Sequence, residues 1–429
     1  MERLYQYLWK TGIPGYEFRD VDGAEVQVLD PGVHNMNAGP DFFNSRIRIN
    51  GVDWIGNVEI HVKASDWFRH GHSDDPAYKN VILHVVGVSD KRVSREDGSL
   101  IPQIEITYPE KFYQIYNALS EESSMVKCGG MLGNLPRLQR VDWLETLSVE
   151  RMQQKAGKVK ELMALTGGDW EQTCFILLAR GLGFGLNGDP FELIAKSLPL
   201  KILHHHSDNP FQLEALLFGQ AGMLDATLYM FDEYFQALCR EYYFLARKYN
   251  LKPLRPGLWK YSRTRPQNFP HRRIAFLANS AVGGFRLFSR LLESKEDLES
   301  LLDLFDMKAQ GYWETHFSFD TQASPTPSTL SRASRILLLI NVAVPLIYSY
   351  ASVVGDMDLG ERAVNLMQSL PAENNTIVRG WQNLGFDVKD ASMSQALIHL
   401  RKEYCDKNRC IYCRFGHHFL RKSAQACSR

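Results

Sequence analysis

The spacing of apolar residues changes once along this chain, near residue 130, and that change limits the folds open to it. Before it, short apolar runs are separated by turn residues, which is typical of β-strands. From about residue 135 onward, apolar residues recur at helical spacing. The pattern predicts an α+β protein with three parts. These are a small N-terminal mixed β-sheet domain over 1–130, a large all-helical domain over 131–400, and a short Cys-rich tail over 401–429.

The composition is that of a globular protein large enough to bury more than one core. Of 429 residues, 45% are hydrophobic, and Lys+Arg and Asp+Glu both total 49, so the net charge excludes no class of partner. The start of the chain has no apolar signal region. Residues 336–355 are uncharged but contain Asn341 and Pro345, which favours a buried helix over a membrane span. Seven cysteines do not indicate a disulfide framework. We therefore expect a cytoplasmic protein without a membrane segment.

Asn50-Gly51 is a strong hairpin signal between two of the predicted strands. A hairpin closed by this turn pairs Ile47 with Trp54. Continued along both strands, the same register brings Asp41 near Glu59 or His61. The sequence therefore predicts two carboxylates at one end of a hairpin.

The alternation of side chains along a strand adds two ionisable residues to Glu59. Glu59, His61 and Lys63 share one face of the second strand. Two carboxylates beside a basic group suit Mg²⁺ or Mn²⁺ and a substrate phosphate. Asp41 and Glu59 are the predicted catalytic metal ligands, and His61 or Lys63 would assist the attacking water. The alternative is a hairpin with a solvated charged face.

Pro40-Asp41 and Glu59-Ile60-His61 together resemble the motif of the PD-(D/E)XK phosphodiesterase superfamily. The resemblance implies a leading helix, a three-stranded meander, a helix and a further strand, with metal-dependent cleavage of phosphodiester bonds. His61 stands where the superfamily has lysine, and Lys63 is a candidate substitute. More broadly, the segments "GNVEIHVKASDW", "QLEALLFGQAGML" and "RPQNFPHRRIAFLA" resemble a bacterial family of unknown function over most of the chain, which implies no established activity.

A second group of candidate ligands lies in "HGHSDDPAY", just after the hairpin. His70, His72 and Asp74 could ligate a transition metal, because imidazole nitrogens and carboxylate oxygens are common ligands of such ions. A lid over the hairpin site is another interpretation. A polar surface turn, started by Asp75-Pro76, is the simplest one.

Residues 242–292 contain no Asp or Glu but eleven Lys or Arg, although the whole chain is balanced. Aromatic residues are interleaved within the loop-like part, 252–273. Such a loop suits contact with phosphates and stacking on bases. The predicted nucleic-acid contacts are Lys260, Arg263, Arg265, Arg272 and Arg273. Pairing with acids elsewhere in the fold, or contact with another partner, are the alternatives.

The tail holds Cys405-x4-Cys410-x2-Cys413, a usual spacing for a thiolate metal site. Zn²⁺ or an iron–sulfur cluster would fit these thiolates. His417, His418 or the distant Cys128 would complete the set, and His417 is the predicted fourth ligand. Separate buried or free cysteines are the alternative.

Taken together, the residues favour metal-dependent phosphodiester hydrolysis on nucleic acid. Two other functions stay open. One is a non-catalytic nucleic-acid or protein-binding module that keeps the fold. The other is a metallo-hydrolase of another phosphoester that uses His70, His72 and Asp74.

Overall fold

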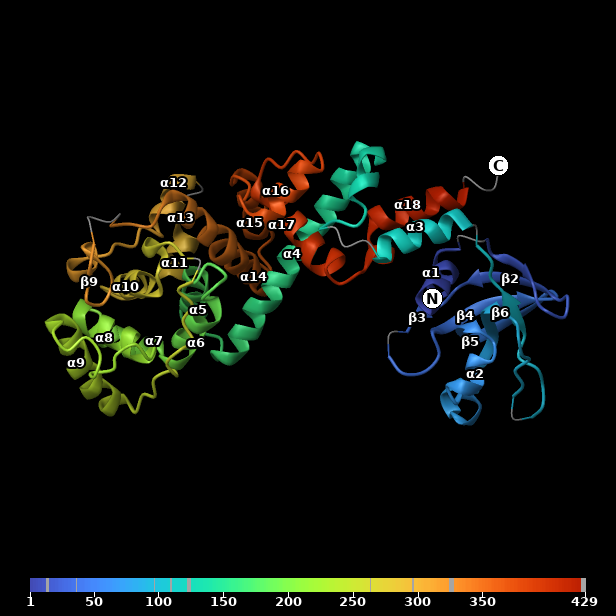
Figure 1. Ribbon diagram of the computed structural model, residues 1–429, viewed down its shortest axis with the longest axis horizontal. Coiled ribbons are helices and arrows are strands. Elements are labelled where there is room, and N and C mark those ends of the chain that lie inside the picture. Colours follow the sequence, from blue (N-terminus) through green and yellow to red (C-terminus); the bar gives the residue numbers. More distant parts are fainter. Residues whose placement is uncertain are drawn as a thin grey trace. The chain divides into compact units, whose positions relative to one another are not determined.

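The chain forms two compact units in the computed structural model (Figure 1). One unit comprises residues 1–140 and 401–429, and the other comprises 141–400. The described residues are 1–12, 15–35, 37–95, 97–108, 110–121, 125–262, 264–294, 297–323 and 328–425. The α+β class that the sequence predicts is confirmed, because strands gather in the first unit and helices make up nearly all of the second. The tail does not stand apart as the sequence predicts but belongs to the N-terminal unit.

A mixed seven-stranded sheet forms the base of the N-terminal unit. Its strands are β1 (Glu17–Arg19), β2 (Glu25–Asp30), β3 (Val33–His34), β4 (Phe42–Ile49), β5 (Val52–Lys63), β6 (Val81–Val88) and β7 (Gln103–Glu105). They lie in the order β1-β2-β4-β5-β6-β7, and β3 pairs with β4. The pairs from β1 to β5 are antiparallel, whereas β6 is parallel to both β5 and β7.

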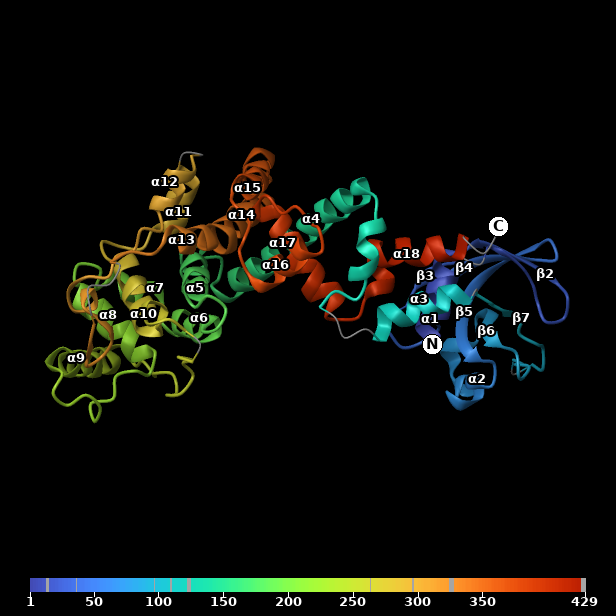
Figure 2. The same cartoon turned by 45° about the horizontal axis from the view of Figure 1, so that its top comes forward.

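Four helices accompany this sheet. They are α1 (Glu2–Thr11), α2 (Asp66–Arg69), α3 (Glu110–Glu121) and α18 (Arg414–Gln425). The amphipathic helix α1 buries Leu4 and Leu8 and packs against β5. Figure 2 shows α3 and α18 side by side, so the end of the chain returns to the N-terminal unit. A parallel strand pair needs a crossover, and α2 with two 3-10 turns (His72–Asp74 and Pro76–Tyr78) makes it between β5 and β6.

Among its described residues, the second unit is helical apart from a two-stranded ribbon, β8 (His316–Ser318) and β9 (Thr321–Gln322). The long helix α4 (Arg137–Leu165) leads into it. The others are α5 (Trp170–Leu182), α6 (Gly188–Ser197), α7 (Leu200–His204), α8 (Pro210–Gln220), α9 (Glu233–Tyr249), α10 (Pro270–Ser280), α11 (Leu287–Glu293), α12 (Leu298–Asp303), α13 (Arg332–Leu338), α14 (Val344–Val354), α15 (Met357–Ser369), α16 (Thr376–Asn383) and α17 (Ala391–His399). Their apolar faces enclose one core.

The helical run Arg332–Val354 is, among the described residues, the one segment long and apolar enough to cross a membrane by length and composition. It comprises α13, a π-helical turn (Leu339–Ala343) and α14. Leu339, Ile340 and Leu346 within it are fully buried in the core of the helical unit.

Candidate metal centre

The β4–β5 hairpin brings Asp41 to Glu59. Asn50 and Gly51 both have positive φ, as the predicted two-residue turn requires, and Ile47 pairs with Trp54 as the sequence predicts. At the open end, the backbone N–H of Asp41 donates to Glu59 Oε2 at 3.1 Å. The Asp41 carboxylate accepts in turn from the backbone N–H of the residue after Glu59, also at 3.1 Å. The two acids are therefore fixed beside each other.

Helix α1 adds two polar residues to this end of the hairpin. Gln6 donates from Nε2 to Asp41 Oδ1 at 2.8 Å. Burial, the neighbouring Glu59 and the charge of Glu2 all raise the pKa of Asp41, and burial raises the pKa of Glu59. Among the described residues, neither Asp41 nor Glu59 forms a salt bridge with lysine or arginine. Two largely buried carboxyl groups without such a partner therefore lie side by side here, and near neutral pH they hold protons unless a cation replaces them.

The crossover from β5 to β6 carries His70 and His72 onto the same place. His72 stacks on Tyr78, with ring centroids 3.9 Å apart, and packs edge-on against Trp67. His72 Nε2 is buried, makes no hydrogen bond among the described residues, and lies 3.3 Å from Glu59 Oε1. His70 Nδ1 lies 3.2 Å from the Nε2 atom of His61 on β5. The two candidate sites that the sequence keeps separate are therefore one cluster.

Two predicted members of these sites lie outside the cluster. The side chain of Asp74 is exposed in the turn after His72. Lys63 is also exposed. Hydrogen bonds from Ser65 lower the pKa of Asp90, and the charge of Lys63 adds a smaller effect in the same direction. Lys63 lies outside the cluster because β5 ends at this residue and the crossover begins there. Lys63 is thus not placed as a substitute lysine beside Glu59.

A chain of hydrogen bonds fixes the tautomer of His61. The Gln103 amide nitrogen donates to the Lys91 carbonyl at 3.3 Å, so its oxygen faces His84 and accepts from His84 Nδ1 at 3.2 Å. His84 must then accept through Nε2, and the partner at 2.8 Å is His61 Nδ1. Burial lowers the pKa of His61 to about 2 and that of His84 to about 4, so both rings are neutral. His61 therefore carries its lone pair on Nε2, 3.2 Å from His70 Nδ1.

The potential ligand atoms of the cluster lie close together. One ring nitrogen each of His61, His70 and His72 lies within 4.8 Å of the others. Glu59 Oε1 is 3.6 Å from His61 Nε2. Three imidazoles and a carboxylate suit Zn²⁺, Mn²⁺ or Fe²⁺ better than Mg²⁺, which prefers oxygen ligands. The residues present thus fit a transition metal, and the nitrogen ligands are what the expectation of Mg²⁺ at Asp41 and Glu59 left out.

The sequence interpretation missed the roles of Glu2, Gln6, His84 and Gln103. Glu2 and Gln6 are four residues apart on α1. This spacing puts both side chains on one helix face, so the sequence could have predicted that they lie together. His84 is buried on β6 and hydrogen-bonded to His61. Its role as a support for His61 depends on the parallel pairing of β5 with β6, in which His61 lies opposite Val86. Local sequence pattern does not reveal that pairing.

The predicted basic contacts divide between surface and core. Lys260 and Arg265 are exposed in the loop before α10. Arg272 and Arg273 are instead buried in α10, where Arg272 donates to the Trp313 carbonyl at 2.7 Å and Arg273 lies over the Phe184 ring. Buried guanidinium groups do not reach a nucleic acid on the surface, so these two residues are corrected to core positions. Arg263 lies outside the described residues.

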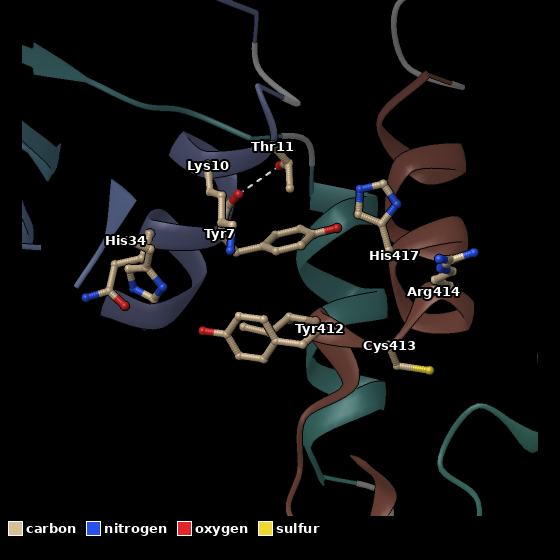
Figure 3. Close-up of a pocket in the computed structure, with 10 residues that line it drawn as sticks. Tyr7, Lys10, Thr11, His34, Tyr412, Cys413, Arg414 and His417 are labelled. Atoms are coloured by element: carbon tan, nitrogen blue, oxygen red, sulfur yellow. Dashed lines mark hydrogen bonds between the residues drawn. The ribbon is translucent and has the colours of Figure 1, made fainter. Parts of the chain in front are cut away.

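In the tail, His417 lines a cavity of 270 Å³ together with residues of α1. Its ring meets Tyr7 edge-on, with centroids 5.9 Å apart. Figure 3 shows His417 beside Tyr7, while the Cys413 sulfur points away from both. In this orientation the His417 ring contacts Tyr7, and its place as a ligand beside the tail cysteines stays a prediction.

The hydrogen-bond chain behind His61 gives a prediction. Gln103→Leu keeps the volume but removes the acceptor for His84 Nδ1, so the orientation of His61 is no longer fixed. We expect metal affinity to fall by about 10–100-fold, as for other outer-shell partners of metal-binding histidines. Competition with a chromophoric chelator measures this affinity. Gln103→Glu, which keeps an acceptor, should lose much less; equal affinity for wild type and Gln103→Leu would contradict the assigned tautomer.

Comparison with known proteins adds one match. The family described as "Protein of unknown function (DUF2851)" matches residues 2–376. The matched range contains all ligands of the candidate metal centre and ends before the tail cysteines. No curated protein and no solved structure matches the chain. Because the match covers most of the 429 residues, the chain belongs to the DUF2851 family, whose function is unknown.

Proposed function

We propose that this protein is a metal-dependent hydrolase of phosphodiester bonds in nucleic acid. The observation that carries the proposal is the convergence of Glu59 with His61, His70 and His72. One ring nitrogen of each histidine lies within 4.8 Å of the others, and Glu59 Oε1 lies 3.6 Å from His61 Nε2 and 3.3 Å from His72 Nε2. Such an arrangement is costly without a proton or a cation between the groups. The proposed ligands differ from those that the hairpin pattern suggested, because the crossover supplies two of them.

Each residue has a defined task in this proposal. Glu59 and the three histidines hold the ion, and the chain from Gln103 keeps His61 in the ligating tautomer. The bound ion supplies Lewis acidity and an acidified water. Asp41 lies beside this position and takes a proton from the attacking water, a role for which its raised pKa is suited near neutral pH. A cavity of 210 Å³ borders His72 and is also lined by Lys79 and Arg95, together with Asp75 and Asp97.

The order of elements supports the phosphodiesterase assignment. Helix α1 precedes an antiparallel meander of β2, β4 and β5, and the short α2 leads to β6, parallel to β5. Apart from the short strands β1 and β3, this is the order that the resemblance to PD-(D/E)XK enzymes implies. The exposed Lys260 and Arg265, within a stretch free of acids, support nucleic acid as the substrate.

A second candidate function rests on a different observation. Lysine is absent from the position of His61, and Lys63 is exposed outside the cluster. If catalysis requires that lysine, the protein is a nucleic-acid-binding module that keeps the fold and a bound metal. Binding without cleavage is the result that would support this function.

The test uses the full-length protein, stripped of metal and reloaded separately with Zn²⁺, Mn²⁺, Fe²⁺ or Mg²⁺. Cleavage of labelled single-stranded DNA, double-stranded DNA and RNA is followed beside hydrolysis of p-nitrophenyl phosphate, a monoester. Release of shorter oligonucleotides with a transition metal supports the proposal. Activity on the monoester alone would replace it with a phosphomonoesterase function. Absence of hydrolysis with every ion would overturn it.

A further inference from the structure

Four cysteines of the N-terminal unit come from two distant parts of the chain. Cys128 precedes a 3-10 helix (Gly129–Asn134), whereas Cys405, Cys410 and Cys413 lie in the turns that lead to α18. Cys128 and Cys413 are buried. Cys410 and Cys413 close one tight turn, in which the Cys413 N–H donates to the Cys410 carbonyl at 3.2 Å. None of the four forms a disulfide.

Several contacts place the two parts together. Cys410 Sγ lies 3.5 Å from the carbonyl oxygen of Leu119, near the end of α3. Lys127, next to Cys128, is close enough for its charge to lower the pKa of Cys410, although burial raises that pKa more. Burial raises the pKa of Cys128, and so would a charge on any of the three tail thiols. Cys128 therefore lies within electrostatic range of all three.

We propose that Cys128, Cys405, Cys410 and Cys413 form a four-thiolate metal centre that fastens the tail to the N-terminal unit. Zn²⁺ and iron–sulfur clusters share this set of ligands, and the experiment below separates them. Cys128 takes the fourth position, because His417 faces Tyr7. Cys128 and Cys413 are buried, and Cys405 and Cys410 are half-buried, so all four thiols are at least partly shielded from solvent.

The packing around the turn is consistent with a fixed centre. A Cβ added to Gly416 would lie 2.0 Å from the Cys410 carbonyl oxygen, so α18 approaches the turn more closely than any other residue type allows. The turn and α18 are thus held together at the backbone, and α18 lies against α3. A closed structural centre of this kind does not itself take part in hydrolysis, so it stands apart from the proposed function.

The experiment compares purified full-length wild type with Cys128→Ser and Cys410→Ser, prepared without oxygen. Zinc, iron and acid-labile sulfide are measured per chain, together with the visible absorption spectrum. We expect each variant to lose about one centre's content of metal. Iron with sulfide and a brown colour identifies a cluster, and colourless zinc identifies a mononuclear site. Cys239→Ser, which alters a buried cysteine of the helical unit, is the matched control and should keep the wild-type content.

A second measurement needs no variant and so does not depend on folding of the mutants. Thiol alkylation of wild type is quantified by mass spectrometry before and after metal removal. The four thiols should become reactive together, while Cys174, fully buried in the helical unit, stays protected. Loss of the histidine ligand in His72→Ala should leave this metal in place, which separates the centre from the hydrolytic site. Equal metal in wild type and Cys128→Ser, or independent reactivity of Cys128, would overturn the proposal.

Discussion

Replacing Glu59 with glutamine is expected to lower metal-dependent cleavage of nucleic acid by on the order of 10³-fold, the range seen when a group acting on the reacting atoms is lost. Glutamine keeps the shape and still accepts from the Asp41 N–H, so the hairpin stays intact. It removes the charge that lies 3.3 Å from His72 Nε2 and 3.6 Å from His61 Nε2. His72→Ala should have a comparable effect, because it removes a ligand outright. Initial rates at saturating metal measure both.

Two residues that the sequence also nominates provide matched controls. Asp74 is two positions from His72, and Lys63 is two positions from His61, but both side chains are exposed outside the cluster. Asp74→Asn and Lys63→Ala should keep cleavage within about threefold of wild type, as surface changes usually do. A loss with Lys63→Ala as large as with Glu59→Gln would restore the motif interpretation in which a lysine migrates along the strand, and the histidine-based centre would then be wrong.

Metal removal should cost the N-terminal unit about 4 kcal/mol of stability when the free ion stands at about 1,000 times its dissociation constant. This cost should increase as the pH rises. In the metal-free protein, the folded state raises the pKa of Asp41 and Glu59, so it holds protons that the unfolded chain has released above about pH 4. Their contribution is therefore present at low pH and is lost as the pH rises through the raised values. A bound cation replaces those protons and prevents the loss.

The histidines act in the opposite direction. Burial lowers the pKa of His61 to about 2 and that of His84 to about 4. Below about pH 6.5, the unfolded chain therefore binds protons that the folded state does not bind. Both forms of the protein thus lose stability on acidification. Above that pH, the carboxyl groups are the ones that change the free energy of unfolding. The difference in this free energy between metal-loaded and metal-free protein should therefore widen from about pH 6.5 to about pH 8.5.

Hydrogen exchange on peptides that cover β5 and β6 measures this gap within the sheet, independently of the helical unit. Faster exchange in the metal-free protein, with a difference that grows toward the higher pH, is the expected result. Glu59→Gln serves as the control, since it lacks one of the two coupled carboxylates. A difference that shrinks with rising pH would show that the ion does not compete with protons at Asp41 and Glu59.

The sequence predicts what depends on local pattern. The Asn50-Gly51 turn fixes the register of Ile47 with Trp54, which brings Asp41 close to Glu59. The exact pairing at that end depends on a register shift between Phe42 and Ser45, which the local pattern does not show. The joining of His70 and His72 to the two acids depends on the parallel crossover, which is a long-range event. The burial of Arg272 has the same kind of cause, because its partner is the Trp313 carbonyl, 41 residues away. Charge counts along the chain do not show which cations face inward.

The division of the N-terminal unit into 1–140 and 401–429 has a consequence for synthesis. All proposed ligands of the hydrolytic centre precede residue 141 in the sequence. The nascent chain therefore contains them before the helical unit is synthesised. About 260 further residues must then be translated, which takes roughly 10–50 s, before Cys405, Cys410 and Cys413 can reach Cys128. During that interval the first part of the unit lacks its last helix, and the helical unit has time to fold first. Translational arrest within the helical unit would thus yield a chain with the complete hydrolytic ligand set but only one of the four cysteines.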